Sequence, residues 1–250
     1  MLLTRASSLA YDSLLAIVYP QACAVCGGSV ESCALGVACA NCWQQTQMFS
    51  GAETLCWKCG QPSSGIVPVE KREEVRCRRC DQDAFTVARA CGTYEGALRA
   101  SVLQLKREPY ICRKLRDRLV YMQQQSPLNR ATLIIPVPLH AEREQMRGFN
   151  QATLIGRELS RATSLPLDEV SLVRNKHVKR HRAGMDAKGR RETVADAFCV
   201  THPALVAGER VLLVDDVFTT GATVSSCASV LLTAGATEVF VLTIARPVRY

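Results

Sequence analysis

The most informative stretch of this sequence runs from residue 211 to residue 223 and reads Val211-Leu212-Leu213-Val214-Asp215-Asp216-Val217-Phe218-Thr219-Thr220-Gly221-Ala222-Thr223. Its first four residues form a continuous apolar run, which is typical of a central parallel strand covered on both faces. A helical pattern follows over residues 224–234, and Gly235 is a suitable residue to end that helix. Strand, loop and helix in this order predict an α/β fold that binds its ligand beyond the carboxyl end of the strand.

The loop between this strand and this helix has the side chains of a sugar-phosphate site. Three threonine hydroxyls and the backbone N–H groups can surround a phosphate, and Gly221 lets the backbone come close to it. The following helix would direct its positive end at the same anion. Asp215 and Asp216 can accept hydrogen bonds from a ribose diol or lie near a bound cation.

These residues resemble the phosphoribosyl pyrophosphate signature of type I phosphoribosyltransferases. The resemblance implies a parallel sheet flanked by helices and a site for phosphoribosyl pyrophosphate with magnesium. It also implies that Asp215 and Asp216 contact the 2- and 3-hydroxyls of the ribose. The residues implied to hold the 5-phosphate are Phe218, Thr219, Thr220, Gly221, Ala222 and Thr223.

A second apolar strand ends in Ile135-Pro136-Val137-Pro138-Leu139-His140. In related phosphoribosyltransferases the loop after the first core strand faces the pyrophosphate, which by position is residues 138–143, and the Arg147–Gln151 motif would open the next helix. An arginine suits a diphosphate because its planar fork binds two oxygens at once. We therefore expect Arg143, Arg147 and Asn150 to bind substrate. Helix capping and surface solvation are the alternative roles for Arg147 and Asn150.

The segment before residue 81 contains four Cys-x-x-Cys units, which are Cys23/Cys26, Cys39/Cys42, Cys56/Cys59 and Cys77/Cys80. Zinc prefers four thiolates at tetrahedral corners, and each unit presents two sulfurs to one ion. We expect two structural zinc ions, with the units paired in sequence order. Interleaved pairing and an iron–sulfur cluster are the alternatives. The cysteines outside the units are expected to be small core residues, and these are Cys33, Cys91, Cys112, Cys199 and Cys227.

Taken together, these motifs make nearly the whole chain similar to the ComF/GntX family, which joins a double zinc ribbon to a phosphoribosyltransferase-like domain. We expect an N-terminal helix and double zinc ribbon over residues 1–90 and the phosphoribosyltransferase-like domain over residues 91–250. The chain departs from the family between Arg174 and Phe198, where a glutamine and an asparagine of the family pattern are replaced in the stretch His181–Thr193.

The charge of the chain points to anionic partners. The 250 residues carry a formal net charge of +8, which favours phosphorylated small molecules or nucleic acid without choosing between them. Eight of the cations lie between Arg174 and Arg191. This segment is either a solvated loop, or a phosphate-binding lid or nucleic-acid contact. The sequence has no secretory signal and no run long enough to span a bilayer, so we expect a cytoplasmic protein that does not enter the membrane.

Three functions are compatible with these residues. The first is a phosphoribosyltransferase, although the sequence offers no convincing general base and no signature for the acceptor. The second, implied by the resemblance, is a non-enzymatic accessory protein of natural competence and DNA uptake that binds single-stranded DNA or a helicase partner. The third is a ligand-responsive regulator, because fold alone does not decide function.

Overall fold

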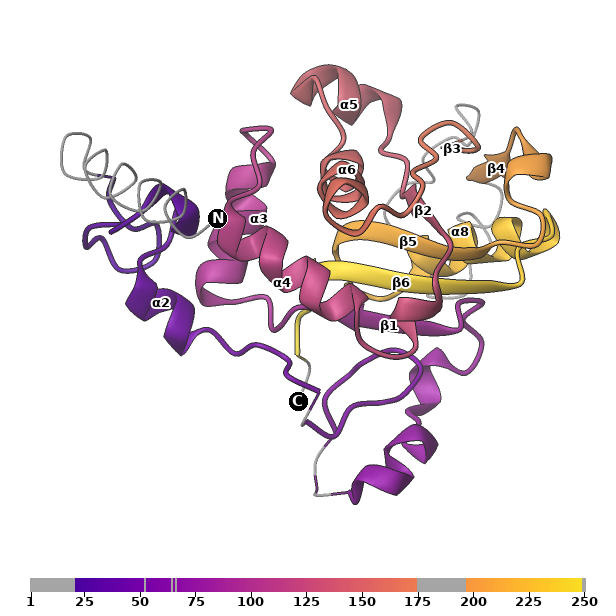
Figure 1. Ribbon diagram of the computed structural model, residues 1–250, viewed down its shortest axis with the longest axis horizontal. Helices are drawn as coiled ribbons and strands as arrows, with labels where there is room; N and C mark the ends of the chain where they lie inside the picture. The colour runs from indigo at the N-terminus through magenta and orange to yellow at the C-terminus, as the bar shows by residue number, and fades with distance from the viewer. Residues whose placement is uncertain (1–20, 52, 64, 66, 175–196, 249–250) are drawn as a thin grey trace, which may run out of the picture.

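The computed structural model describes residues 21–248 except 52, 64, 66 and 175–196. Four parallel strands form its main sheet in the order β1-β6-β5-β2, and their bounds are β1 Val87–Ala90, β2 Leu133–Pro136, β5 Arg210–Val217 and β6 Glu238–Ala245. Figure 1 shows this sheet at the centre of the molecule, with the cysteine-rich segment along its left and lower sides. The predicted architecture, a parallel sheet flanked by helices and preceded by a zinc-ribbon module, is confirmed.

The helices of the sheet domain are α3 Gly96–Leu105, α4 Arg113–Gln123, α5 Ala141–Arg147, α6 Gln151–Thr163 and α8 Ala222–Thr233. Two further strands, β3 Leu172–Arg174 and β4 Phe198–Val200, form a separate antiparallel pair. The short 3-10 helices are η4 Leu128–Arg130 and η5 Pro203–Leu205. Within the described ranges, no helix is both long and apolar enough to cross a bilayer.

The N-terminal segment has little regular structure of its own. Its elements are η1 Cys33–Leu35, α2 Ala40–Gln45, η2 Val69–Glu74 and η3 Arg78–Cys80. The segment continues directly into β1, which pairs with β6 and so belongs to the main sheet. The predicted division of the chain at residue 90 therefore falls at the end of a sheet strand, and it stays a prediction. The predicted N-terminal helix lies outside the described residues.

The two faces of the sheet have separate cores, because side chains alternate along each strand. Leu212 and Val214 face one core, which contains the buried sides of α3, α4 and α6. Val211 and Leu213 face the other core, which contains α8. Each core also takes cysteines from a different part of the N-terminal segment: Cys23, Cys39 and Cys42 join the first, and Cys56, Cys59 and Cys80 join the second. Both halves of that segment are therefore packed onto the sheet domain.

Candidate functional site

Two adjacent carboxylates lie at the carboxyl end of β5. Asp215 pairs in register with Thr243 of β6, and its Oδ1 accepts a hydrogen bond from the backbone N–H of Asp216 at 2.8 Å. The Nζ atom of Lys106, at the end of α3, lies 3.6 Å from Oδ2 of Asp216. Sequence reasoning missed this lysine, since no local pattern connects the end of one helix to a distant strand.

The surroundings of Asp215 change the pKa of its carboxyl group. Burial raises its pKa to about 7, and the negative charge of Asp216 acts in the same direction. The hydrogen bond from the Asp216 backbone and the charge of Lys106 oppose the shift. Asp215 therefore holds its proton more tightly than an exposed aspartate does, and a bound cation would favour its release.

The loop after β5 carries backbone N–H and hydroxyl groups of the kind that an anion site uses. Gly221 is the N-cap of α8 and has a left-handed backbone with φ of +83°. Thr219 and Thr220 are exposed, and Thr223 in the first turn is half-buried. The first N–H groups of a helix have no partner within it, and the helix dipole places positive charge at the same end. The 12-residue helix α8 thus begins at the end of the loop that follows the two aspartates.

Phe218 has a different place from the rest of the loop. Its side chain is buried and meets Phe85 edge to face, with ring centroids 5.8 Å apart. Its backbone N–H donates to the carbonyl of Ala245 at 3.0 Å, so this N–H is occupied in the structure. Phe218 supports the loop from beneath, whereas the exposed threonines face outward.

The second set of expected substrate residues follows β2, the neighbour of β5. The backbone N–H of Val137 donates to Val214 at 2.9 Å, so the two strand ends lie at one edge of the sheet. The Arg147–Gln151 motif opens helix α6, as expected, but a short helix that was not expected precedes it. Residues 141–147 form the short helix α5, and α6 begins only at Gln151 because Asn150 caps it.

The side chains of Arg147 and Asn150 have partners within the protein. Asn150 Oδ1 accepts from the N–H of Ala152 at 3.0 Å, and its Nδ2 donates to the carbonyl of Val137 at 2.9 Å. Arg147 donates from Nη1 to Oε1 of Gln151 at 2.8 Å. The capping role weighed for Asn150 is therefore present, and its role in substrate binding stays a prediction.

Arg143 of α5 and Arg174 of β3 influence each other electrostatically. Burial lowers the pKa of Arg174, and repulsion from Arg143 lowers it further, so these two cations lie within electrostatic range of each other. The guanidinium of Arg174 lies 5.2 Å from the ring centre of Phe198. The rest of the basic segment, and the altered stretch His181–Thr193, lie outside the described residues.

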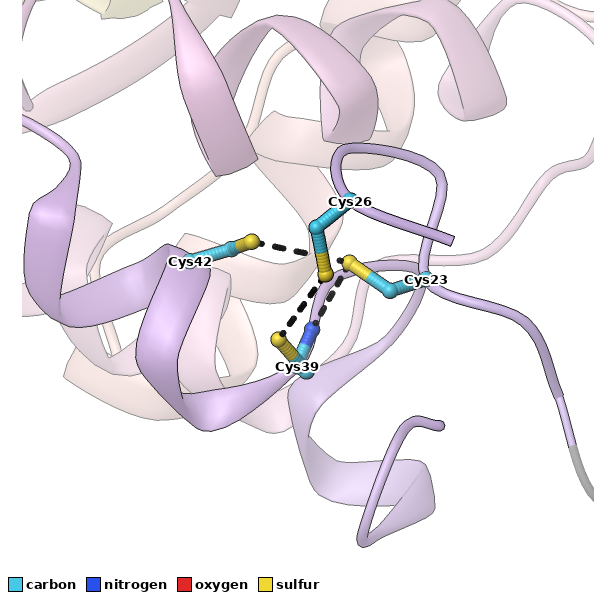
Figure 2. Close-up of side chains that lie close together, drawn as sticks. All are labelled: Cys23, Cys26, Cys39 and Cys42. Carbon is cyan, nitrogen blue, oxygen red and sulfur yellow. Dashed lines mark hydrogen bonds between the residues drawn. The ribbon is translucent and has the colours of Figure 1, made fainter. Parts of the chain in front are cut away.

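The first four-cysteine cluster contains Cys23, Cys26, Cys39 and Cys42 (Figure 2). The sulfur atoms point toward one another, with 3.7 Å between Cys23 and Cys42 and 3.7 Å between Cys26 and Cys39. A Zn–S bond of about 2.3 Å places the sulfurs of a tetrahedral site about 3.8 Å apart. The backbone N–H of Cys39 also donates to the sulfur of Cys23 at 3.3 Å, which stabilises a thiolate.

The second cluster contains Cys56, Cys59, Cys77 and Cys80. Its sulfurs are 3.6 Å apart between Cys56 and Cys80 and 3.5 Å apart between Cys59 and Cys77. A hydrogen bond from the Cys59 side chain lowers the pKa of Cys56 to about 4. Both clusters join the units in sequence order, and their geometry fits two four-cysteine zinc sites.

The remaining cysteines behave in two ways. Cys91, Cys112 and Cys227 are buried, as expected. Cys33 and Cys199 are exposed, so their prediction as core residues was wrong. Cys33 begins a single 3-10 turn, and Cys199 occupies the outward position of a short strand that alternates its side chains.

Comparison with known proteins agrees with this geometry. Residues 14–81 match the model of the double zinc ribbon domain. The chain is 31% identical to the DNA utilization protein YhgH of Escherichia coli O157:H7 over 202 residues, covering 78% of this chain and 85% of that protein. The chain belongs to the ComF/GntX family.

Two further ComF relatives are named for competence. Competence protein ComFC of Bacillus subtilis is 26% identical over 79% of this chain and 78% of that protein. Competence protein F of Haemophilus influenzae is 40% identical over 117 residues, and this match spans about half of each protein (45% of this chain and 49% of the relative).

Among solved structures, the chain is similar to the glutamine phosphoribosylpyrophosphate amidotransferase from B. subtilis complexed with ADP and GMP. The identity is 26%, the TM-score is 0.36, and the match covers 52% of this chain and 26% of the other.

Proposed function

We propose that this ComF-family chain binds phosphoribosyl pyrophosphate with magnesium at the loop between β5 and α8. The observation that carries the proposal is that two carboxylates end strand β5, and that the loop after them leads to a left-handed glycine at the amino end of α8. A phosphate needs backbone N–H groups and hydroxyls, whereas a ribose diol needs acceptors. The loop offers both kinds of group side by side.

Each part of the loop has a distinct task in this proposal. Thr219, Thr220, Gly221, Ala222 and Thr223 hold the 5-phosphate, and Phe218 supports them from below. Asp215 and Asp216 accept hydrogen bonds from the ribose hydroxyls, while Lys106 forms an ion pair with Asp216. Arg143, Arg147 and Asn150 bind the pyrophosphate end. Magnesium, when bound, would neutralise the diphosphate and stabilise it as a leaving group.

In the same proposal, residues 1–90 form a double zinc ribbon with one structural ion in each cysteine cluster, and residues 91–250 form the phosphoribosyltransferase-like domain. The reaction class is transfer of the phosphoribosyl group to an acceptor, with displacement of pyrophosphate from C1 of the ribose. The chain would either perform this transfer or retain the binding site of an ancestor that did.

Calorimetry with magnesium and phosphoribosyl pyrophosphate tests the binding site. The double variant Asp215→Ala with Asp216→Ala removes two acceptors, each worth about 1.5–3 kcal/mol, so affinity should fall by at least about tenfold. A charge-matched control is Asp117→Ala with Glu158→Ala, because these acids lie on α4 and α6 beside the surface arginines Arg116 and Arg161. Equal affinity in wild type and the Asp215/Asp216 variant would refute the assignment of the acid pair.

A second candidate is a non-enzymatic role in competence and DNA uptake, favoured by the names of the ComF relatives. Such a protein would keep the phosphoribosyl site as a sensor and bind single-stranded DNA or a helicase partner. Release of pyrophosphate with a panel of nucleobases would support the enzyme. Salt-dependent binding of single-stranded DNA without turnover would support the accessory role, and ligand binding with neither result would leave the regulator.

A further inference from the structure

Arg246 is a charged residue in an unusual place. It directly follows β6 and is only 4% exposed. Its backbone is fixed on both sides, because its N–H donates to Gly92 at 3.1 Å and its carbonyl accepts from Tyr94 at 2.7 Å. A guanidinium buried to this degree needs specific partners. Those partners lie in two regions that the proposed function treats separately.

One set of partners belongs to the second cysteine cluster. Arg246 donates from Nη1 to the carbonyl of Cys59 and from Nη2 to Oε1 of Gln61, the latter at 2.6 Å. Gly60 lies between these two residues with φ of +69°. A Cβ atom on Gly60 would lie 2.8 Å from the carbonyl of Ala88 and 3.6 Å from Nη1 of Arg246. The cysteine turn is therefore packed directly against Arg246 and the sheet.

The other partner is Phe218, which precedes residues 219–223, the candidate phosphate loop. The guanidinium carbon of Arg246 lies 5.0 Å from the centre of the Phe218 ring. On its far edge the same ring approaches Gly221, where an added Cβ would lie 2.9 Å from Cζ of Phe218. The ring is thus enclosed by Arg246, Phe85 and the left-handed turn that begins α8.

The segment after Cys80 makes a second contact with the same turn. The backbone N–H of Ala84 donates to Oγ of Ser225 in the first turn of α8 at 3.0 Å. The Oδ2 atom of Asp83 lies 3.4 Å from the position of a Cβ on Gly221. The segment around the second cysteine cluster therefore contacts the loop in two ways. One contact runs through Arg246 and Phe218, and the other runs through Asp83 and Ala84.

From these contacts we infer that Arg246 is a positioning residue for the phosphate loop, through which the second cysteine cluster fixes the turn at Gly221. The cluster orients the guanidinium, the guanidinium holds the ring of Phe218, and the ring supports Gly221. A zinc ion held by the four thiolates of this cluster would leave a net negative charge beside Arg246, which would favour the buried cation. The first cluster has no part in this pathway, since it packs with the core on the opposite face.

The test compares Arg246→Lys with Arg89→Lys. Arg89 is the matched control because it also joins the segment around the second cysteine cluster to the sheet. Its guanidinium lies 5.0 Å from the centre of the Trp57 ring and donates to the carbonyls of Trp57 and Ala88, so it does not hold Phe218. Lysine keeps the charge in both variants and loses the planar fork. Zinc content and hydrogen exchange of the amides of residues 218–225 are measured in each protein, together with affinity for phosphoribosyl pyrophosphate and magnesium.

With zinc content unchanged, Arg246→Lys should raise amide exchange over residues 218–225 by about tenfold, because the loop opens locally more often. Arg89→Lys should leave that exchange at the wild-type rate. Cys77→Ser in the second cluster should reproduce the effect of Arg246→Lys, whereas Cys26→Ser in the first cluster should not. If Arg246→Lys fails to fold, Gln61→Ala replaces it, with a smaller rise of about threefold from the loss of one hydrogen bond.

The ligand measurement rests on the proposed function, and the exchange measurement does not. Affinity for phosphoribosyl pyrophosphate should fall with Arg246→Lys by about tenfold or more. If wild type does not bind this ligand, the proposed function fails and the exchange data alone decide the role of Arg246. Equal exchange over residues 218–225 in wild type, Arg246→Lys and Gln61→Ala would overturn the inference, as would an equal rise in Arg246→Lys and Arg89→Lys.

Discussion

Gly221 caps α8 and lies against the ring of Phe218, so Gly221→Ala would place a methyl group in a packed turn. Two physical costs combine there. The left-handed backbone, with φ of +83°, is unfavourable for alanine, and the new methyl group would lie 2.9 Å from Cζ of Phe218. That ring cannot turn away freely because Phe85 and Arg246 contact it.

The two costs can be separated with Gly208→Ala. Gly208 has nearly the same φ, +82°, and a Cβ there would meet nothing within 4 Å. The left-handed backbone alone costs about 1–2 kcal/mol, whereas forcing a methyl group into a packed site adds about 1–3 kcal/mol. We therefore expect the free energy of unfolding to fall by about 1–2 kcal/mol in Gly208→Ala and by about 2–5 kcal/mol in Gly221→Ala.

Urea titration with zinc in excess would measure both losses on the same chain, and calorimetry would measure the affinity for phosphoribosyl pyrophosphate. Gly221→Ala should lower the affinity for this ligand, because the amino end of α8 must shift to accommodate the methyl group. Gly208→Ala should bind it as wild type does. Equal destabilisation by the two substitutions, with unchanged affinity in both, would refute the argument that Phe218 closes the space behind the loop.

Two further predictions concern metal and pH. Metal analysis should find about two zinc ions per chain. Cys56→Ser should lower the zinc content to about one ion per chain and destabilise the segment around the second cysteine cluster. Absence of zinc, or iron–sulfur absorption, would reject the assignment. Because the pKa of Asp215 is about 7 in the folded protein and about 3.9 in the unfolded chain, the native state binds the proton more tightly, and this contribution to stability is lost as pH rises through 7. Thermal unfolding between pH 4 and 8 should therefore show that wild type loses stability relative to Asp215→Asn as the pH rises, by at most about 1.4 kcal/mol per pH unit. If the stabilities of the two proteins change in parallel with pH, the pKa of Asp215 is not raised.

Helix capping and anion binding cannot be separated from sequence alone, because both use the same polar side chains. Asn150 illustrates this, since its oxygen accepts from the N–H of Ala152 and its amide donates to Val137. The extra helix α5 was equally hard to foresee, since its seven residues include none that is buried and so give no apolar stripe. Cys33 and Cys199 were misplaced because a small residue carries little information about its own burial.

Local spacing was sufficient for the features that a few consecutive residues define. Residues 211–223 predicted the strand β5, the loop and the start of α8, because an apolar run, two acids and a glycine are read directly along the chain. The four Cys-x-x-Cys units predicted two clusters, because each turn fixes its own pair of sulfurs. The sequence also predicted the order of the ribbon module and the sheet domain.

Only the tertiary structure decided which distant groups meet. Lys106 reaches Asp216 from the end of α3, Arg246 joins the second cluster to Phe218, and the two clusters support opposite faces of the sheet. These contacts follow from the order of strands and from the alternation of side chains across the sheet. The alternation is local to each strand, but the strand order is not encoded in the spacing of a single motif, because it is set when residues far apart in the chain pair and bury the same surface.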